Sequence, residues 1–358
     1  MSMEFKTTAE KFREMRFLSL QPDWEKLPDP NFEFLPDDFE PADEEAKANF
    51  IEKAPPVSYW KDAWRRLKQN HVAMVSLGVI VVIFIFAFIC PFFYENDYST
   101  QVRGAENIFP CWEYPFGTDK FGRDLLLRTM YGTRVSLVVG VCASLIVLVI
   151  GTIYGSISGF CGGMVDNIMM RIVELIYSVP EVLVVLLIST TIKQPLQDWA
   201  NSHQDMAIAD TIISIGPGLI AIFIAFGLLY WVTMARIIRG QVLMLKEQEY
   251  VTAARALGAK GTKIVKRHLW PNCIGQIIVT TCMQIPSAIF LESFLSFLGI
   301  GVAAPVTSLG AMASDALGGI YTYTYRLIIP SILLSVLILS LNLFGDGLRD
   351  ALDPRLKK

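Results

Sequence analysis

Two carboxylates lie within long apolar stretches of this sequence, and their placement limits the chemistry they can perform. Glu181 follows Pro180 in the apolar run of residues 168–192, and Glu292 lies at the end of the run that begins at Cys273. A charged group near the centre of a bilayer is costly unless it faces water or a partner inside the protein. Each carboxylate is therefore a candidate for lining a pathway through a membrane. The alternative, a structural pairing inside the protein, stays open for both.

The sequence lacks the motifs of a catalytic or nucleotide-binding site. The segment Gly117–Gly122 resembles the start of a phosphate-binding loop, but Arg123-Asp124 follow where Lys-Ser/Thr would hold phosphate and magnesium. The sequence contains no dinucleotide fingerprint, and its six cysteines and three histidines show no metal or redox spacing. We therefore expect no cofactor on this chain and no enzymatic activity. Transport against a gradient would need energy from a separate subunit or from an ion.

The composition indicates an integral membrane protein. Of the 358 residues, 53% are hydrophobic and 18% are charged, which is too apolar for a soluble protein of this length. A membrane-spanning helix needs about 20 apolar residues. Three charge-free runs are long enough, and three others carry isolated charges or prolines. The six predicted spans are residues 72–94, 135–165, 168–192, 211–235, 273–291 and 327–348.

The distribution of Lys and Arg predicts the orientation of these spans. With the N-terminus inside, the cytoplasmic flanks and loops hold seventeen basic residues and the outer ones hold seven. We therefore expect both termini in the cytoplasm and residues 95–134 outside. Five of the seven outer basic residues lie in that one segment and contradict the rule locally; they are Arg103, Lys120, Arg123, Arg128 and Arg134.

Residues 249–272 form a polar, basic segment between two apolar runs, which we call the polar segment. Four of its residues have the spacing of one helical stripe: Tyr250, Ala253, Ala254 and Leu257. Gly258 follows where a helix would stop, and a second short helix is predicted from about Thr262 until Pro271 ends it. This second helix would bury Ile264, Val265 and Leu269. Such a segment suits the grip of a soluble partner, and the alternative is a loop lying on the bilayer surface.

Three glycines at intervals of four residues lie in the second predicted span. Gly151, Gly155 and Gly159 would form a groove on one face of a helix, where another helix backbone can approach closely. We expect this groove to serve helix packing rather than direct contact with a substrate.

The first 53 residues differ from the rest, with 14 Asp or Glu against 7 Lys or Arg and several prolines. This composition predicts a cytosolic extension that is partly disordered. It is either a solvated tail or a segment whose aromatic residues dock on a partner.

The polar segment resembles the EAA loop of ABC importer permeases, a cytoplasmic helix-turn-helix that docks into a cleft on the ATPase subunit. The matching residues are Thr252-Ala253-Ala254, Gly258 and Leu269-Trp270-Pro271, with Thr252 where the family usually has Glu. The resemblance implies that ATPase coupling involves Tyr250, Thr252, Ala253, Ala254, Leu257, Gly258, Ile264 and Leu269.

Further motifs resemble the C-type permease of dipeptide and oligopeptide importers, from about Tyr59 to the end of the chain. They are Gly117-Thr118-Asp119-x-x-Gly122-Arg123-Asp124, Gly132-x-Arg134-x-Ser136-Leu137, Gly162-Gly163-x-x-Asp166, Ser296-Phe297-Leu298-Gly299-Ile300-Gly301 and the run from Asn342 to Arg355.

The resemblance implies an all-α integral membrane protein of the cell membrane, with the six transmembrane helices of the type I ABC importer permease fold and a cytoplasmic coupling helix-turn-helix. Its implied partners are a second homologous permease, two ATPases that carry ATP and magnesium, an extracytoplasmic peptide-binding protein and the lipid bilayer, with no nucleic acid. Two alternatives come from other classes. One is a secondary transporter with Glu181 as its proton site, and the other is a membrane-anchored scaffold.

The predicted organisation has five parts. They are a cytosolic extension (1–58), an anchor helix region (59–94), an extracytoplasmic segment (95–134), a permease core (135–348) that contains the coupling loop 236–272, and a cytosolic tail (349–358).

Overall fold

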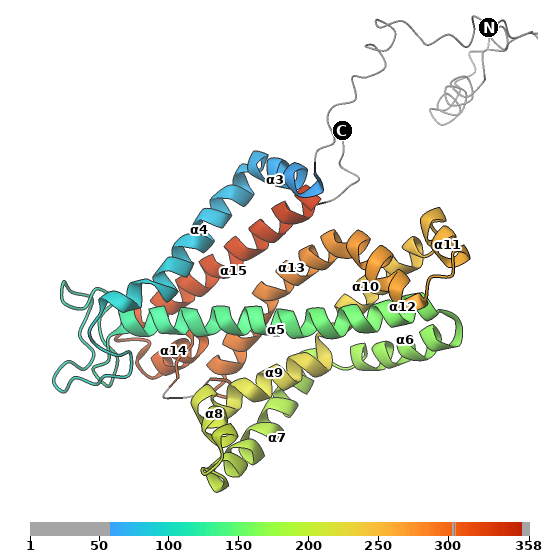
Figure 1. Ribbon diagram of the computed structural model, residues 1–358. Coiled ribbons are helices and arrows are strands. Elements are labelled where there is room, and N and C mark those ends of the chain that lie inside the picture. The colour runs from blue at the N-terminus through green and yellow to red at the C-terminus, as the bar shows by residue number, and fades with distance from the viewer. Residues whose placement is uncertain (1–57, 303, 305, 353–358) are drawn as a thin grey trace, which may run out of the picture. The chain divides into compact units, whose positions relative to one another are not determined.

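The computed structural model describes residues 58–302, 304 and 306–352, and helices joined by loops make up this part of the chain (Figure 1). Nearly all of the predicted extension (1–58) and the end of the predicted tail (349–358) lie outside the described residues. Within them, 5 helices are long and apolar enough to cross a membrane, and a bent pair brings the number to 6. The prediction of six spans in an all-helical fold agrees with this architecture.

The candidate spans are α4 (His71–Phe88), α5 (Leu125–Cys161), the pair α6 (Gly163–Tyr177) and α7 (Glu181–Ser202), the pair α9 (Pro217–Leu229) and α10 (Trp231–Leu245), α13 (Trp270–Phe297) and α15 (Tyr325–Leu352). The shorter elements are α3 (Tyr59–Gln69), η3 (Cys90–Phe93), α8 (Ala207–Ile215), α11 (Glu249–Ala256), α12 (Gly261–Ile264), the π-helical turn η4 (Val265–Leu269), α14 (Leu309–Ala316) and η5 (Leu317–Gly319).

Helix α5 is the central element and packs against α10, α13 and α4 (Figure 1). The glycine groove predicted on this helix is the surface that receives α10. A Cβ atom on Gly155 would lie 2.4 Å from the backbone oxygen of Ala235, and one on Gly151 would lie 2.5 Å from Cβ of Met234. Only glycine permits this approach between the two helices, so the packing prediction is confirmed.

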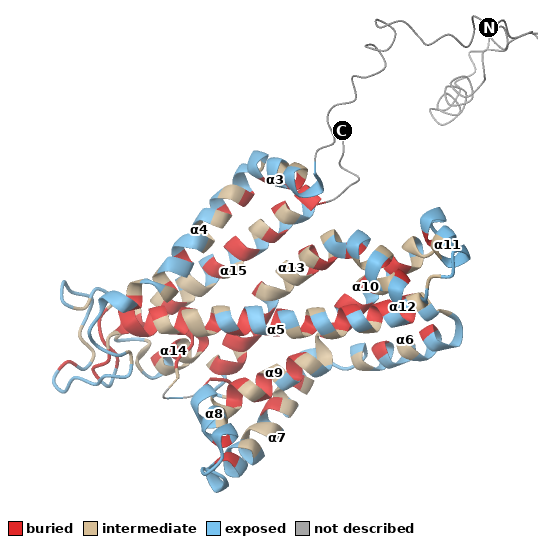
Figure 2. Cartoon of the chain, viewed as in Figure 1, coloured by how far each residue is buried: buried red, intermediate tan, exposed pale blue. Residues whose placement is uncertain are grey.

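The outer faces of the spans are apolar. On α4, Val75 is 69% exposed and Val82 is 65% exposed. Buried residues gather instead where α5 meets its neighbours, while α4 is pale blue over much of its length (Figure 2). A helix that exposes this much apolar surface is suited to contact with lipid.

The second span begins ten residues earlier than predicted, at Leu125 rather than Val135. The side chain of Asp124 accepts a hydrogen bond from the backbone N–H of Leu126 at 2.7 Å and caps the helix. With 37 residues, α5 is roughly 55 Å long, well beyond the roughly 30 Å of a hydrocarbon core. Residues 125–134 therefore belong to this helix and not to the preceding loop.

The third span is not the single helix predicted for residues 168–192. It consists of α6 and α7, which meet at an angle of 82° across a break at residues 178–180. Pro180 is the last residue of this break. A proline disfavours the helical conformation in the residue before it, here Val179. Glu181 is therefore the first residue of a new helix, and the expectation that it lies within one continuous span is wrong.

Two other span boundaries also differ from the prediction. The fourth span runs from Pro217 to Leu245, whereas residues 211–215 belong to the separate helix α8. Pro271 does not end the short helix of the polar segment, because the helical run continues from Gly261 to Phe297. The π-helical turn, which ends two residues before this proline, changes the backbone hydrogen-bond spacing near a residue that cannot donate.

Candidate functional site

The first half of the polar segment folds as the sequence predicts. Helix α11 ends at Ala256, and Gly258 follows with a φ of +81°, a conformation that favours glycine. The backbone N–H of Ala259 donates to the carbonyl oxygen of Ala254 at 3.0 Å and closes the helix end. Figure 1 places α11 and α12 near the end of α5 that is opposite the loop before Leu125.

Six of the predicted coupling residues form the outward part of this segment, which we call the loop surface. Leu257 is 89% exposed and Tyr250 is 40% exposed. A leucine this accessible outside a lipid-facing span offers an apolar anchor for another protein. The loop surface consists of Tyr250, Thr252, Ala253, Ala254, Leu257 and Gly258, of which Ala254 is half-buried and the others are exposed.

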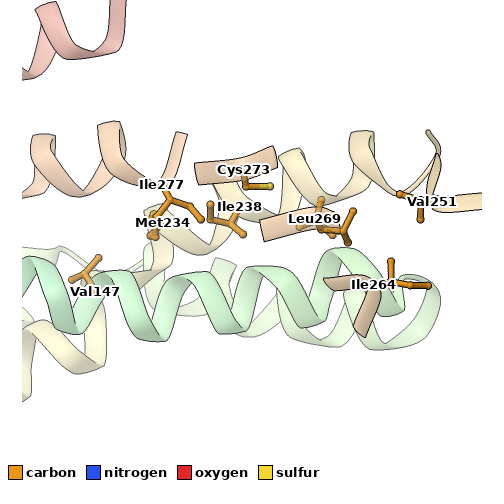
Figure 3. Close-up of a cluster of buried hydrophobic side chains, with 9 residues drawn as sticks. Val147, Met234, Ile238, Val251, Ile264, Leu269, Cys273 and Ile277 are labelled. Carbon is orange, nitrogen blue, oxygen red and sulfur yellow. The ribbon is translucent and has the colours of Figure 1, made fainter. Parts of the chain in front are cut away.

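The other two predicted coupling residues, Ile264 and Leu269, face the interior of the chain as the prediction of a buried second helix requires. They are 1% and 0% exposed and belong to one cluster with Val251 of α11. The same cluster contains Met234, Ile238 and Val242 of α10, Val147 of α5, and Cys273 and Ile277 of α13 (Figure 3). Ile264 and Leu269 therefore connect the loop surface to the spans from inside.

Val251 was not among the predicted site residues. It is fully buried although it lies beside Tyr250 on a short exposed helix. The sequence did contain one sign of this burial. Val251 is a branched apolar residue outside the predicted stripe, which indicates that α11 has a second face turned toward the protein.

Hydrogen bonds fix the polar segment to the end of α5. The indole Nε1 of Trp270 donates to Oγ of Ser156 at 2.9 Å. Just before the segment, Nζ of Lys246 donates to the carbonyl oxygen of Gly159 at 3.0 Å. A Cβ atom on Gly261 would lie 2.7 Å from the ring of Phe160, so the start of α12 rests directly on α5. A displacement of the polar segment must therefore act on α5 as well as on α10.

A partly buried ion pair joins α6 to α10 near the same end. Asp166 accepts hydrogen bonds from Nε and Nη2 of Arg239, both at 2.6 Å, and a third from the hydroxyl of Ser158. Sequence reasoning named Asp166 only as part of a motif and did not assign it a partner. The pairing spans 73 residues of chain, so no local pattern could have identified Arg239.

A cavity of about 810 Å³ lies at the bend between α6 and α7. Glu181 lines it at the start of α7, together with Tyr230 before α10, and the two side chains interact. Gln284 of α13 and Asn342 of α15 add polar groups, while Phe290 supplies an apolar wall. The walls therefore combine one carboxylate with neutral polar and apolar groups from several helices.

Glu292, the other candidate carboxylate, has a different environment. Its side chain is fully buried and accepts hydrogen bonds from the hydroxyls of Ser136 at 2.9 Å, Ser296 at 2.7 Å and Ser293 at 3.3 Å. It is not among the residues that line the cavity beside Glu181. The geometry of Glu292 matches the structural pairing that the sequence left open, because its oxygens are satisfied within the chain.

A second ionic cluster ties the loop before α5 to α14. Asp119 pairs with Nε of Arg123 and Nη1 of Arg128, both at 2.6 Å, and Nη2 of Arg128 reaches Asp315 at 3.2 Å. Burial alone would raise the pKa of Asp119, but the charge of Arg128 and backbone N–H donors hold that pKa below its ordinary value. Arg123 and Arg128 contradict the orientation rule, and both form ion pairs within the chain.

Comparisons with known proteins identify the family. Residues 151–358 match the family described as "Binding-protein-dependent transport system inner membrane component", and residues 58–110 match the "N-terminal TM domain of oligopeptide transport permease C". The chain is 44% identical to the dipeptide transport system permease protein DppC of Bacillus subtilis, over 86% of this chain and 89% of that one. It is 43% identical to the oligopeptide transport system permease protein OppC of Bacillus subtilis, over 89% and 97%. For OppC of Escherichia coli the identity is 39%, over 87% and 97%.

The family match covers more than half of the chain, and these relatives are similar over nearly their whole length. They are transport permeases and not enzymes. The all-helical fold, with its glycine-packed α5 and α10 and its polar segment between two spans, is the fold of type I ABC importer permeases. The chain therefore belongs to the family of binding-protein-dependent transport system inner membrane components.

Proposed function

We propose that this chain is a membrane-spanning permease subunit of an ABC importer for dipeptides or oligopeptides. The relatives that support this substrate class are named as permeases of dipeptide and oligopeptide transport systems. The structural observation that carries the mechanism is the polar segment, which exposes Leu257 outward and buries Val251, Ile264 and Leu269 against the spans.

The proposed assembly contains a second, related permease that completes the pathway. Two ATPase subunits bind ATP and magnesium and contact the loop surface, and a peptide-binding protein delivers substrate on the other side of the membrane. This arrangement puts both termini and the polar segment in the cytoplasm and the loop before α5 outside. The basic residues of the polar segment support this orientation, and so do the internal pairs of Arg123 and Arg128.

Coupling in this proposal is mechanical. Closure of the ATPases on ATP displaces the loop surface, and the cluster of Val251, Ile264 and Leu269 transmits the movement to α10 and α5. A densely packed interior transmits such a displacement because it cannot absorb it by compression. The helices that line the cavity would then alternate between access from one side and from the other.

The two carboxylates have separate roles in this proposal. Glu181 lines the pathway, since it faces the cavity at the α6–α7 bend. Glu292 holds α13 to α5 through Ser136 and has no contact with substrate.

Transport driven by ATP distinguishes this function from a secondary carrier. The chain is assembled with its companion subunits in proteoliposomes, and uptake of a labelled dipeptide is measured with ATP supplied on the ATPase side. We expect uptake that requires ATP, stops with vanadate and continues after a protonophore collapses the proton gradient. Uptake abolished by the protonophore at constant ATP would instead identify an ion-driven transporter.

A further inference from the structure

Helix α3 lies at the very end of the first span. Only Asn70 separates its last residue, Gln69, from His71 at the start of α4. Asn70 has extended backbone angles, and its side chain accepts a hydrogen bond from the N–H of Ala73 at 3.1 Å and caps α4. Because α4 is a candidate span from its first residue, α3 must lie at a boundary between bilayer and water.

One face of α3 is fixed to the end of α15. Ala63 and Leu67 are buried, and they pack in clusters with Leu348, Ala351 and Leu352. The hydroxyl of Tyr59 also donates to the carbonyl oxygen of Leu352 at 3.0 Å. The rotation of α3 about its own axis is therefore determined, and with it the direction of its other side chains.

The rest of the helix surface carries tryptophan beside this contact and positive charge opposite it. Trp60 and Trp64 are 52% and 48% exposed, although each is a large apolar side chain. Lys61, Arg65 and Lys68 are also exposed. Successive residues are rotated by about 100° around the helix axis. In this projection the two tryptophans lie next to the packed sector, and the three basic residues lie beyond the tryptophans.

The charges on this face are neutralised only in part within the helix. Asp62 is the one acidic residue of α3 and lies within 3.0 Å of both Arg65 and Arg66. Lys68 has its Nζ 5.4 Å from the ring centre of Trp64, so one cation stands beside one indole ring. Lys61 and Lys68 add two further positive charges to the exposed side.

We propose that the exposed face of α3, formed by Trp60, Lys61, Trp64, Arg65 and Lys68, binds anionic phospholipids at the membrane surface. Indole rings prefer the level of the lipid headgroups, and basic side chains beside a span attract anionic headgroups. An interfacial helix needs an apolar sector and a basic sector side by side, which is the order found around α3. Residues 1–53 are acidic and could also pair with the basic residues of α3. Such a pairing would not explain why two tryptophans are exposed at the end of a span.

Quenching by brominated lipids tests this proposal on the full-length chain. The chain is reconstituted in phosphatidylcholine vesicles that contain equal fractions of either dibrominated phosphatidylglycerol or dibrominated phosphatidylcholine. The fluorescence of Trp60 and Trp64 is obtained as the difference between the native chain and a W60F/W64F variant. We expect phosphatidylglycerol to be preferred over phosphatidylcholine about tenfold at these two residues.

Two matched double variants separate a lipid site from a general effect of charge. K61Q/K68Q removes two charges from α3, one of them stacked on an indole ring. R103Q/K120Q removes two charges from the loop before α5, where Lys120 stacks on Phe121 at 5.0 Å. We expect K61Q/K68Q to reduce the preference to about twofold and R103Q/K120Q to leave it unchanged.

Three results would overturn the proposal. One is equal quenching of Trp60 and Trp64 by the two lipids, as when the acidic N-terminal residues or another protein cover this face. Another is an equal loss of preference in the two double variants. The third is a preference in total tryptophan quenching that is as large in W60F/W64F as in the native chain. Thermal unfolding of each variant identifies any that fails to fold, and in that case K61Q and K68Q are compared singly with R103Q.

Discussion

Asp166 and Arg239 join the start of α6 to the middle of α10 through two hydrogen bonds of 2.6 Å. Arg239 directly follows Ile238, whose side chain belongs to the buried cluster beneath the loop surface. The same α6 leads to the bend where Glu181 lines the cavity. The ion pair thus links α10, which contacts the polar segment, to α6, which leads to the cavity.

Removal of the Asp166 charge should destabilise this link. Asp166→Asn removes the charge that binds the half-buried guanidinium of Arg239, at a cost of about 2 kcal/mol for hydrogen bonds to a charged group. We expect a lower thermal unfolding temperature for the purified chain. Glu174→Gln is the matched control, because it makes the same change on α6 in a pair whose side chains are 80% and 62% exposed. That control should cost less than about 0.5 kcal/mol, and an equal effect of the two substitutions would contradict the linking role of Asp166.

The glycine groove should tolerate no methyl group at its centre. A Cβ on Gly155 would lie 2.4 Å from a backbone oxygen of α10, so Gly155→Ala must separate α5 from α10. We expect a loss of about 1–3 kcal/mol in unfolding free energy. Gly227→Ala in α9 serves as control, since its nearest neighbour would be a side-chain atom of Ile146 at 3.5 Å. Alanine should be neutral or slightly stabilising there, and similar unfolding curves for the two variants would argue against close packing at Gly155.

Several of these features follow from local sequence, and others do not. The spacing of Gly151, Gly155 and Gly159 predicts the groove because four-residue intervals align on one helical face. Gly258 predicts the end of α11 for an equally local reason. The break at Pro180 was missed because proline alone does not distinguish a kinked span from a broken one, and an angle of 82° depends on tertiary packing. The partner of Asp166 lies on a distant helix, so its identification required the fold.

Glu181 should influence which peptides pass. Glu181→Gln keeps the shape and most of the hydrogen-bonding capacity of the side chain but removes its negative charge from the cavity. We expect normal stability and weaker competition by cationic peptides relative to neutral ones in uptake assays, by about threefold to tenfold for one lost charge contact. Asp198→Asn provides the control on the same helix, where the carboxylate accepts a hydrogen bond from Gln194 and lies outside the cavity lining. An unaltered peptide preference with normal stability would remove Glu181 from the pathway.

The orientation can be tested with two native cysteines. Cys111 is exposed in the loop before α5, and Cys161 is exposed at the last turn of the same helix. Variants that keep one of the six cysteines are treated with a membrane-impermeant maleimide, in intact cells or in spheroplasts if an outer membrane intervenes. We expect modification of Cys111, whereas Cys161 should react only after the membrane is permeabilised. The reverse pattern would invert the proposed topology.

The central claim is that the loop surface couples this permease to an ATPase, and copurification with matched leucine variants tests it most directly. Leu257→Ala removes the more exposed of the two large hydrophobic side chains of that surface, and Leu298→Ala removes a leucine that is 46% exposed beyond the opposite end of α13. The assembled complex is extracted gently, and the amount of ATPase retained per permease is measured together with substrate-stimulated ATP hydrolysis. We predict that Leu257→Ala lowers both about tenfold, in the range of an interface anchor, while Leu298→Ala retains the ATPase and both permeases reach the membrane at normal levels. Full ATPase retention and full stimulation in Leu257→Ala, and also in Ala254→Glu, would contradict the claim.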